Sequence, residues 1–417
     1  MLLLTLLTAC GPASLEPSAL PDPGRPTVDS GHLPESVAPA DDACPDPGCT
    51  VFQEDLVHEY ALTIREEGWS SLLRDYQTYV PATFSDGRAS LEVGVRIKGY
   101  TSLRPITGKP SLRVSFDRYV DGQRYGQLEA VDLVNSIVDA AVMTEHLAYG
   151  FFRDGGQPAS RTGWAHLSIN EMDYGLYELV EKKDDVLIGL NWSDAGGSLY
   201  ESSTEFWPCD FDDGGDPPCD CFEVDEVGEG DTRADLEGFC SAMTRSSPEA
   251  WWETMQARTD VDRVLRHVAY EIALAAYDHY AGMMGNFYTY HEPATDHWTL
   301  IPASMDRLFG TVYGSAPSCG RTRYQLSDFA SGHLAGRCMA YEPCAIRLYE
   351  RMASAAEDLR SGAIVARLDA ALPLLQPYVE ADPRREYTPD QFVAQVECVR
   401  GWLERRPDEL LDMIPER

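Results

Sequence analysis

Residues 277–310 read YDHYAGMMGNFYTYHEPATDHWTLIPASMDRLFG, and this stretch carries most of the functional information in the chain. An apolar helical run leads directly to Asp278. Asn286 then opens a strand-like run, and a polar turn separates it from a second strand-like run that ends shortly before Asp306. Two strands joined by a polar turn form a hairpin. We therefore expect a hairpin, with strands at 287–290 and 298–302, that holds Asp278, Asn286 and Asp306 near one another at its mouth.

An Asp, an Asn and a second Asp in this order suit phosphoryl transfer, which depends mainly on positioning and on charge neutralisation. One carboxylate can orient an attacking hydroxyl group and accept its proton, which makes Asp278 the candidate base. Mg²⁺ is a hard cation that prefers oxygen ligands, so Asn286 and Asp306 are the candidate metal ligands. Spacing alone is a weak signal. The alternative is that the three residues share no function: Asp278 caps a turn, Asn286 begins a strand and Asp306 lies in a loop.

The same stretch resembles the core of the CotH kinase family, the spore-coat-protein-H-like atypical protein kinases. The family pattern is an Asp, then Asn-Tyr-Tyr-Leu-Tyr, a turn, Trp-x-x-Ile-Pro-Trp-Asp-x-Asp and Phe-Gly. This chain has Asp278, then NFYTY from Asn286, WTLIPASMD ending at Asp306, and Phe309-Gly310. Ser304 stands where the family has the first Asp of its pair. One of two closely spaced carboxylates is therefore missing, which favours an alternative in which the fold has lost catalysis.

The resemblance extends over residues 50–415 and implies an α+β, two-lobed, atypical protein-kinase-like fold with a helical C-terminal tail. The N-terminal lobe is expected at about 50–185 and the C-terminal lobe at 186–415. Periodicity and turn residues predict the individual elements. These are strands at 56–63, 91–97, 111–116 and 175–181, helices at 66–76 and from Asp139 to Gly155, and a helical tail at 344–413 that Pro377 and Pro383 break.

In the N-terminal lobe, the resemblance implies that Lys109 holds the α- and β-phosphates of ATP. Lys98 and Gly99 belong to KGYTS, which partly matches the family's Arg-Gly-Asn-Ser-Ser loop over the phosphates. Residues GLYELVE match the family's Gly-Leu-Tyr-x-x-Val-Glu and place Glu181 near the adenine. The alternatives are that both lysines are solvated surface residues, the commonest fate of lysine, and that Glu181 has a structural role.

Glu145 lies in the first half of the helix expected after Asp139. It would pair with Lys109 if this helix corresponds to the αC helix of protein kinases. The simpler interpretation is a glutamate on an exposed helix face. The helix matches the family in shape, whereas its residues differ from the family's.

The chain begins with MLLLTLLTAC, an apolar stretch that is too short to span a bilayer. Small residues before Cys10 are typical of a lipoprotein cleavage site, so residues 1–10 are interpreted as a signal peptide and Cys10 as the lipidated residue. A plain signal peptide is the alternative. Residues 11–48 are rich in Pro, Asp, Ser and Ala, which predicts a disordered tether. Gly11 in the second mature position favours the outer membrane or the cell surface, with the periplasm as the alternative.

The chain has 11 cysteines. Without Cys10 an even number remains, which suits a disulfide framework in an oxidising compartment, although the sequence leaves the pairing open. Residues 201–232 form an acidic, Cys-rich insert whose spacing fits neither an EF-hand loop nor a zinc site. We interpret it as an acidic surface loop held by disulfides, with calcium binding as the alternative.

Charge limits the partners of the protein. The chain has 34 basic and 68 acidic residues and a formal net charge of −34. This charge argues against nucleic acid as a partner, because its phosphates would be repelled. Binding of ATP against this field requires a local basic pocket or a metal ion, Mg²⁺ or Mn²⁺.

Three functions follow from these patterns. The first is an exported atypical protein kinase that transfers the ATP γ-phosphate to Ser or Thr of an envelope or surface protein and is held at the membrane by the lipid on Cys10. The second is a catalytically impaired pseudokinase that acts as a surface binding, assembly or adhesion module. The third is a disulfide-rich structural component without a pocket.

Overall fold

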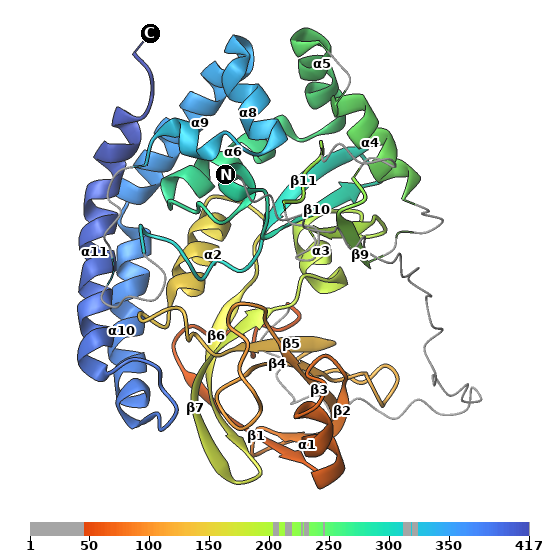
Figure 1. The fold of residues 1–417 in the computed structure, drawn as a ribbon, viewed down its shortest axis with the longest axis vertical. Coiled ribbons are helices and arrows are strands. Elements are labelled where there is room, and N and C mark those ends of the chain that lie inside the picture. The colour runs from red at the N-terminus through yellow and green to blue at the C-terminus, as the bar shows by residue number, and fades with distance from the viewer. Residues whose placement is uncertain are drawn as a thin grey trace, which may run out of the picture. The chain divides into compact units, whose positions relative to one another are not determined.

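The computed structural model describes residues 46–202, 208–212, 219–226, 228, 233–244, 247–311, 318 and 324–416. The predicted signal peptide with Cys10, nearly all of the predicted tether and parts of the acidic insert lie outside these residues. The described chain has an N-terminal lobe of strands, residues 46–183, and a C-terminal lobe of mainly helices, residues 184–416 (Figure 1). The α+β, two-lobed fold with a helical C-terminal tail is confirmed.

Seven strands of the N-terminal lobe close into a barrel in the order β1-β2-β3-β4-β5-β7-β6. Neighbouring strands are antiparallel, except that β1 and β6 are parallel. The predicted alternation in β3 is confirmed, because Leu91, Val93, Val95 and Ile97 are all buried. The strands are β1 (Val57–Ile64), β2 (Val80–Ser85), β3 (Ser90–Lys98), β4 (Ser111–Ser115), β5 (Ala130–Val134), β6 (Thr162–Ile169) and β7 (Met172–Glu181).

Two helices accompany the barrel. Helix α1 (Glu66–Leu72) packs against β2, and α2 (Thr144–Asp154) packs against β6 and against the C-terminal helix α10 (Ala363–Ala381). The prediction that Asp139 is the N-cap residue is wrong, because α2 begins at Thr144. The Asp139 carboxylate nevertheless accepts the N–H groups of Met143 and Thr144 at 2.9 and 2.8 Å. It therefore satisfies donors that the start of a helix leaves without partners.

The C-terminal lobe contains a four-stranded sheet in the order β11-β10-β8-β9. The predicted hairpin is confirmed, because β10 and β11 are antiparallel, with Phe287 opposite Pro302. The strands are β8 (Leu199–Ser202), β9 (Phe222–Glu226), β10 (Phe287–Glu292) and β11 (His297–Pro302). The helices that precede or surround the sheet are α3 (Asp185–Asn191), α4 (Ala234–Thr244), α5 (Pro248–Arg258), α6 (Val261–Ala273) and α7 (Tyr280–Met283).

The helical tail is confirmed, with one difference in where it is interrupted. After the 3-10 turn η1 (Leu326–Phe329), the chain forms α8 (His333–Ala340), α9 (Glu342–Arg360), α10 and α11 (Pro389–Asp412). The prediction that Pro377 breaks the tail is wrong, because Pro377 lies inside α10. Burial of Leu368, Leu375 and Val379 on one face of this helix offsets the hydrogen bond that a proline removes. The helix ends at Ala381, just before Pro383.

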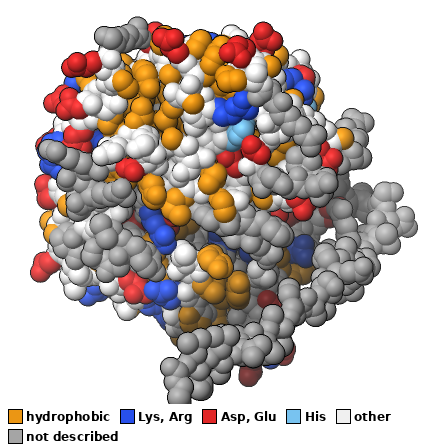
Figure 2. Space-filling model, turned by 45° about the horizontal axis from the view of Figure 1, so that its top comes forward, with side chains coloured by type: hydrophobic (Ala, Val, Ile, Leu, Met, Phe, Trp, Pro, Cys, Tyr) orange, Lys and Arg blue, Asp and Glu red, His pale blue; other side chains and the backbone are white. Residues whose placement is uncertain are grey.

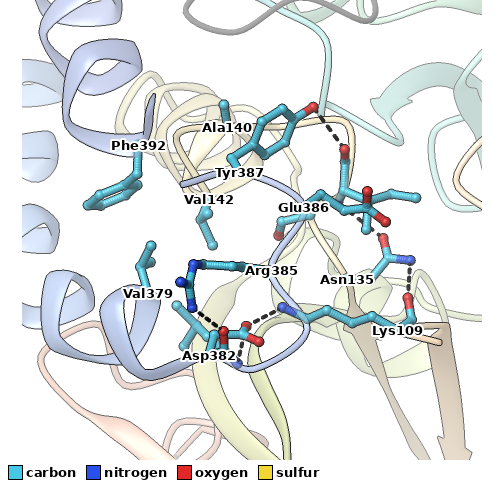
Figure 3. A pocket seen from close by; sticks show the side chains of 13 residues that line it. Lys109, Asn135, Ala140, Val142, Val379, Asp382, Arg385, Glu386, Tyr387 and Phe392 are labelled. Carbon is cyan, nitrogen blue, oxygen red and sulfur yellow. Dashed lines mark hydrogen bonds and ion pairs between the residues drawn. The ribbon is translucent and has the colours of Figure 1, made fainter. Parts of the chain in front are cut away.

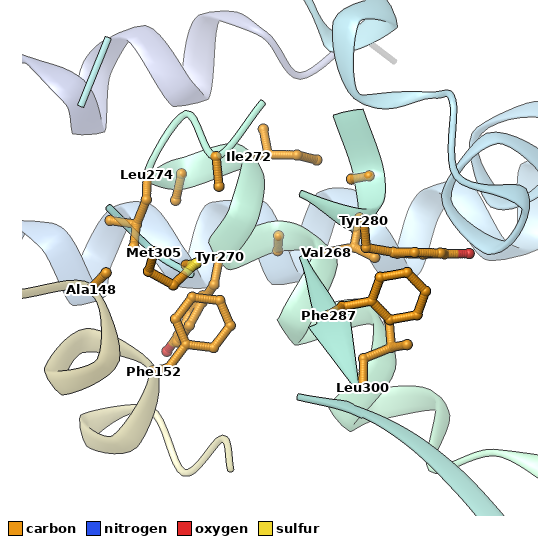
Figure 4. Packing of buried hydrophobic residues seen from close by; sticks show 14 of the residues in the cluster. Ala148, Phe152, Val268, Tyr270, Ile272, Leu274, Tyr280, Phe287, Leu300 and Met305 are labelled. Atoms are coloured by element: carbon orange, nitrogen blue, oxygen red, sulfur yellow. The ribbon is translucent and has the colours of Figure 1, made fainter. Parts of the chain in front are cut away.

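Of three hydrophobic clusters in the described chain, the two largest form the cores of the fold. One fills the barrel, and the other surrounds α6 in the C-terminal lobe. Helix α2 belongs to the second core, since Phe152 contacts Tyr270 of α6 with ring centroids 5.4 Å apart. Figure 4 shows these two rings beside Met305, which directly precedes Asp306. The candidate site therefore rests on a packed core that α2 and α6 share.

Three disulfide bonds lie within the described residues. They join Cys209 to Cys221, Cys219 to Cys240 and Cys338 to Cys344. The predicted disulfide framework is therefore confirmed for these pairs. None of the helices in the described part of the chain has the length and hydropathy that a membrane span requires. On the face of the molecule that Figure 2 shows, acidic side chains are spread out, with basic ones between them.

The described part of the acidic insert supports the C-terminal lobe. The prediction of a surface loop is wrong for Asp210, which is buried and accepts the N–H groups of Phe211 and His333 at 2.7 and 2.5 Å. Burial raises the pKa of Asp210 to about 7. Its neighbour Cys209 donates its N–H to the carbonyl oxygen of Met284 at 2.9 Å. The disulfide-bonded segment therefore fixes the chain that follows α7.

Candidate active site

A cavity of about 610 Å³ lies between the two lobes. Its walls come from β3 and the loop after it, from β4 and β5, from α2, from the end of β7, and from the stretch that the sequence singled out. Lys109 is not among the residues that line it, and Cys10 lies outside the described residues. The cavity brings together the other six predicted site residues: Lys98, Gly99, Glu181, Asp278, Asn286 and Asp306.

Asp278 and Asn286 are linked through the backbone. The side-chain nitrogen of Asn286 donates to the carbonyl oxygen of Asp278 at 2.7 Å. The carbonyl oxygen of Asn286 accepts the N–H of Ala303 at 3.0 Å, which ties this segment to the end of β11. Asn286 has φ +53°, a left-handed conformation that Asn adopts more readily than most residues. Because its nitrogen is used in this bond, the carboxamide oxygen is the atom that remains for a cation.

Asp306 is a half-buried carboxylate in the cavity wall. Among the described residues it has no hydrogen-bond or ion-pair partner. Burial raises its pKa to about 8, and the negative charges of Glu145, Asp139 and Asp278 add to this increase. The positive charge of Arg307 counteracts this increase only in part. A carboxylate with several acidic neighbours and no direct ion pair is a suitable ligand for a divalent metal ion.

Glu145 lies inside the site and not on an exposed helix face. It is buried on α2, and its carboxylate accepts the N–H of Met305 at 3.1 Å. Burial raises its pKa, and the positive charges of Lys183 and Lys98 counteract this. Both earlier interpretations of Glu145 are therefore wrong, because it is neither exposed nor paired with Lys109. It positions the backbone that carries Asp306.

Lys98 belongs to a buried cluster of charges in the barrel wall. Its ammonium lies 2.5 Å from the carboxylate of Asp132 on β5, and Arg113 on β4 contacts the same carboxylate at 2.7 and 2.9 Å. Burial alone would raise the pKa of Asp132, but the charges of Arg113 and Lys98 outweigh it and hold this pKa well below its usual range. Two cations therefore share the carboxylate of Asp132, and Glu201 in the same cavity lining also acts on both of them.

The loop after β3 contacts the predicted base through an arginine. Gly99 has φ +103°, which only glycine adopts without strain. Two residues later, the hydroxyl group of Thr101 accepts a hydrogen bond from Arg307 at 2.8 Å. Arg307 also lies 3.4 Å from the carboxylate of Asp278. It therefore bridges the two lobes across the mouth of the cavity.

Lys109 lies in another part of the molecule, which conflicts with its predicted role in phosphate binding. Its ammonium is buried and lies 2.5 Å from the carboxylate of Asp382, in the loop between α10 and α11. Figure 3 shows this pair beside Asn135, whose side-chain nitrogen donates to the carbonyl oxygen of Lys109 at 2.8 Å. Asp382 also accepts the N–H of Leu176 at 3.0 Å. Lys109 therefore joins the N-terminal lobe to the helical tail.

The structure favours the structural alternative for Glu181. Its carboxylate accepts hydrogen bonds from the backbone N–H and the Nε of Arg161, at 2.9 and 3.0 Å. The side chain is almost fully buried. Because both oxygens are used by Arg161, Glu181 contributes to the cavity at the end of β7 without offering a free carboxylate.

Arg113, Asp132 and Lys183 are among the charged residues of the cavity that sequence reasoning missed. Arg113 and Asp132 each interrupt an otherwise apolar or small-residue strand, SLRVS and AVDLV. A charge at such a position is rare unless it is paired, and this signal could have found them. Lys183 directly follows another lysine and looks like a surface residue, so the sequence gives no comparable signal for it.

The cavity differs in charge from the whole protein. Its lining includes six acidic side chains and six basic ones, whereas the full chain has twice as many acidic as basic residues. The basic side chains are Arg96, Lys98, Arg113, Lys182, Lys183 and Arg307. Basic side chains therefore make up a larger share of the charged residues in the cavity than in the whole chain. An acidic protein needs such a local basic region to bind an anionic ligand.

A divalent cation fits the site only if a bound substrate supplies some of the atoms that coordinate it. The described residues contain no group of three or more His, Cys, Asp or Glu side chains that could hold a metal ion by themselves. Mg²⁺ commonly binds through one or two carboxylates together with substrate phosphates. Asp306 and the carboxamide oxygen of Asn286 match that set of donors. Ser304 is exposed at the position of the absent carboxylate and offers a neutral oxygen.

Comparisons with known proteins identify the family of this chain. The family model described as CotH kinase protein matches residues 95–410. The crystal structure of a Helicobacter pylori proinflammatory kinase, CtkA, is similar at a TM-score of 0.33 and 10% identity, covering 73% of this chain and 92% of that chain. No curated protein sequence matches. Because the family model covers most of the chain, this protein belongs to the CotH kinase family.

Proposed function

We propose that the protein is an exported lipoprotein kinase that transfers the γ-phosphate of ATP to Ser or Thr of a protein in the cell envelope or on the cell surface. The observation that carries this proposal is the cavity between the lobes, which is lined by Asp278, Asn286 and Asp306. Family membership supports kinase-like chemistry. The balanced charge of the cavity supports a nucleotide as its ligand.

Each residue has a role that its surroundings explain. The acceptor hydroxyl oxygen forms a bond to the γ-phosphorus while the bond to the bridging oxygen of ADP breaks, and Asp278 takes the hydroxyl proton. Asn286 and Asp306 would hold Mg²⁺ or Mn²⁺, which neutralises phosphate charge when bound. Lys98 and Arg113 add positive potential beside the phosphates.

The location of the protein is part of the proposal. Cys10 would carry the lipid, and residues 11–48 would hold the kinase away from the membrane, at the outer membrane or the cell surface, or in the periplasm. The disulfide bonds between Cys209 and Cys221 and between Cys219 and Cys240 support an oxidising compartment.

The test is phosphate transfer by the chain from residue 10 onward, with Cys10→Ser to prevent lipidation. The protein is incubated with γ-labelled ATP, Mn²⁺ or Mg²⁺, and an envelope protein fraction. We expect labelled Ser or Thr, and a loss of about 100-fold or more in Asp278→Asn, because a positioned base contributes at least that much. Asp55→Asn, an exposed carboxylate outside the cavity, is the control and should label normally. Equal labelling by Asp278→Asn would reject Asp278 as the base.

A second candidate function is a pseudokinase that binds a partner on the cell surface. Two observations favour it: Ser304 replaces a family carboxylate, and Arg307 contacts the carboxylate of Asp278. This alternative predicts no labelling by the wild-type protein under any metal condition. Lack of labelling together with no nucleotide-dependent thermal shift would favour it over the kinase proposal.

A further inference from the structure

Lys183 occupies an unusual position in the cavity wall. It follows β7, where the chain passes from the N-terminal to the C-terminal lobe, and its side chain is only 8% exposed. Its ammonium donates to the hydroxyl oxygen of Ser160 at 3.0 Å. It also lies over the rings of Tyr149 and Tyr288, at 5.1 and 5.7 Å from their centroids. Lys183 therefore places a buried positive charge beside the cavity.

This charge has no ion-pair partner within 4.0 Å among the described residues. An ammonium has three donors, and the only hydrogen bond from Lys183 found in the described chain is the one to Ser160. Four of the other five basic side chains of the cavity differ in this respect, and the fifth, Arg96, is less deeply buried. Lys98 and Arg113 are paired with Asp132, Lys182 with Glu226, and Arg307 with Asp278, while Arg96 is half-buried beside the ring of Tyr79.

Burying an ammonium without a carboxylate partner lowers the stability of the folded state. Burial lowers the pKa of Lys183 to about 8, so the group is still mostly protonated at neutral pH. Contacts with Tyr149 and Tyr288 offset part of the cost, because the face of an aromatic ring attracts a cation. The carboxylates of Glu145, Asp132 and Glu201 act on the ammonium from beyond 4.0 Å, and none of them contacts it directly. A buried ammonium without a contacting carboxylate at a cavity wall indicates that an anionic ligand completes its surroundings.

The neighbours of Lys183 indicate which part of a nucleotide would lie next to its ammonium. Its charge acts on Glu145, and Glu145 in turn accepts the N–H of Met305, next to Asp306. The ammonium therefore lies on the side of the cavity where the candidate metal ligand lies. Phosphate oxygens are the nucleotide groups that combine negative charge with proximity to a metal ion.

We propose that Lys183, from the segment that connects the lobes, is the lysine that binds the phosphates of the nucleotide. This inference rests on the proposed function, because it assumes that the cavity binds a nucleotide. It assigns to Lys183 the role that the sequence had suggested for Lys109, whose ammonium is used by Asp382.

The test measures binding of ATP, tripolyphosphate and adenosine, each with Mn²⁺, to the wild type and to Lys183→Met, Lys183→Arg and Lys182→Met. We expect Lys183→Met to weaken the binding of ATP and of tripolyphosphate by about tenfold or more, because a hydrogen bond to a charged group is lost. Adenosine binding should change less than about twofold, and Lys183→Arg should restore part of the phosphate affinity. Lys182→Met is the matched comparison and should weaken the binding of ATP and tripolyphosphate clearly less than Lys183→Met does, since Glu226 neutralises that lysine.

Stability of the ligand-free protein separates a binding role from a structural one. Lys183→Met removes a desolvated charge but keeps an apolar side chain of similar length between two tyrosine rings. The melting temperature without ligand should therefore stay the same or rise. A lower melting temperature together with equal losses for adenosine and ATP would show a structural role and overturn the inference.

The remaining outcomes separate this inference from the function on which it rests. If the wild type binds neither ATP nor tripolyphosphate, the proposed function fails, and the assignment of Lys183 fails with it. If the wild type binds ATP and Lys183→Met binds it equally well, only the assignment of Lys183 is overturned.

Discussion

Replacing Lys109 by Met should destabilise the protein and leave nucleotide binding unchanged. The ammonium of Lys109 and the carboxylate of Asp382 are 7% and 2% exposed and lie 2.5 Å apart. Removing one partner of a buried ion pair costs roughly 3–5 kcal/mol, because the other charge stays buried. Asp382 keeps the N–H groups of Leu176 and Arg384, at 3.0 and 2.7 Å, so we expect a loss of about 3 kcal/mol, near the lower limit.

The assay is urea unfolding together with thermal melting. For a folded region of about 370 residues, an unfolding entropy of about 0.8 kcal/mol/K follows from the usual value per residue, so a loss of about 3 kcal/mol lowers the melting temperature by about 4 °C. Lys182→Met is the matched control, because its partner Glu226 is 37% exposed, against 2% for Asp382, and a solvent-accessible pair contributes less than about 1 kcal/mol. Adding Asp382→Asn to Lys109→Met should destabilise by less than the sum of the single changes, since the two residues interact.

The same variant distinguishes two assignments of the phosphate-binding lysine. Our account predicts that ATP affinity changes less than about twofold in Lys109→Met, because the side chain lies outside the cavity. A melting temperature equal to that of the wild type, combined with tenfold weaker ATP binding, would refute this reasoning. It would show that Lys109 contacts the phosphates after all.

Two further predictions concern the buried charges. Asp132→Asn should lower the free energy of unfolding by about 3 kcal/mol at pH 7, because it leaves Lys98 and Arg113 close together without the Asp132 carboxylate. A loss below about 1 kcal/mol, measured by urea unfolding, would contradict this prediction. The stability of the wild type relative to Lys183→Met should increase by about 2 kcal/mol between pH 7.5 and pH 9.5. The sign follows because the pKa of Lys183 is about 8 when folded and 10.5 in its ordinary state, so the unfolded chain binds more protons in this range. A constant difference across that range would show that the Lys183 ammonium is not destabilised by burial.

Local patterns predicted much of the fold. The alternation of apolar residues in β3 and the two strands around a polar turn in β10 and β11 depend on neighbouring residues only. The segment GLYELVE likewise forms the C-terminal part of β7, as the pattern predicted. These features could be read from the sequence because the side-chain period of a strand and the residues of a turn are short-range properties.

Long-range contacts account for the features that the sequence did not show. Lys109 finds its partner Asp382 across 273 positions, and no local pattern indicates that contact. Glu145 looks like a surface residue of an amphipathic helix, yet α2 is covered on the side of Glu145 by the segment before Asp306. The closure of the seven strands into a barrel depends on the pairing of β1 with β6, which is also nonlocal.

The most direct test of the central claim is thermal stability of the Cys10→Ser chain with ATP, measured with and without Mn²⁺, beside Asp306→Asn. Our account predicts that ATP with Mn²⁺ stabilises the wild type by about 2.7 kcal/mol at a hundredfold excess over its dissociation constant, a shift of about 3 °C. The shift should be absent in Asp306→Asn, whose ligand-free form should be at least as stable because a carboxylate with acidic neighbours is removed. No shift at millimolar ATP, or an equal shift in Asp306→Asn, would contradict the assignment of this cavity as a nucleotide–metal site.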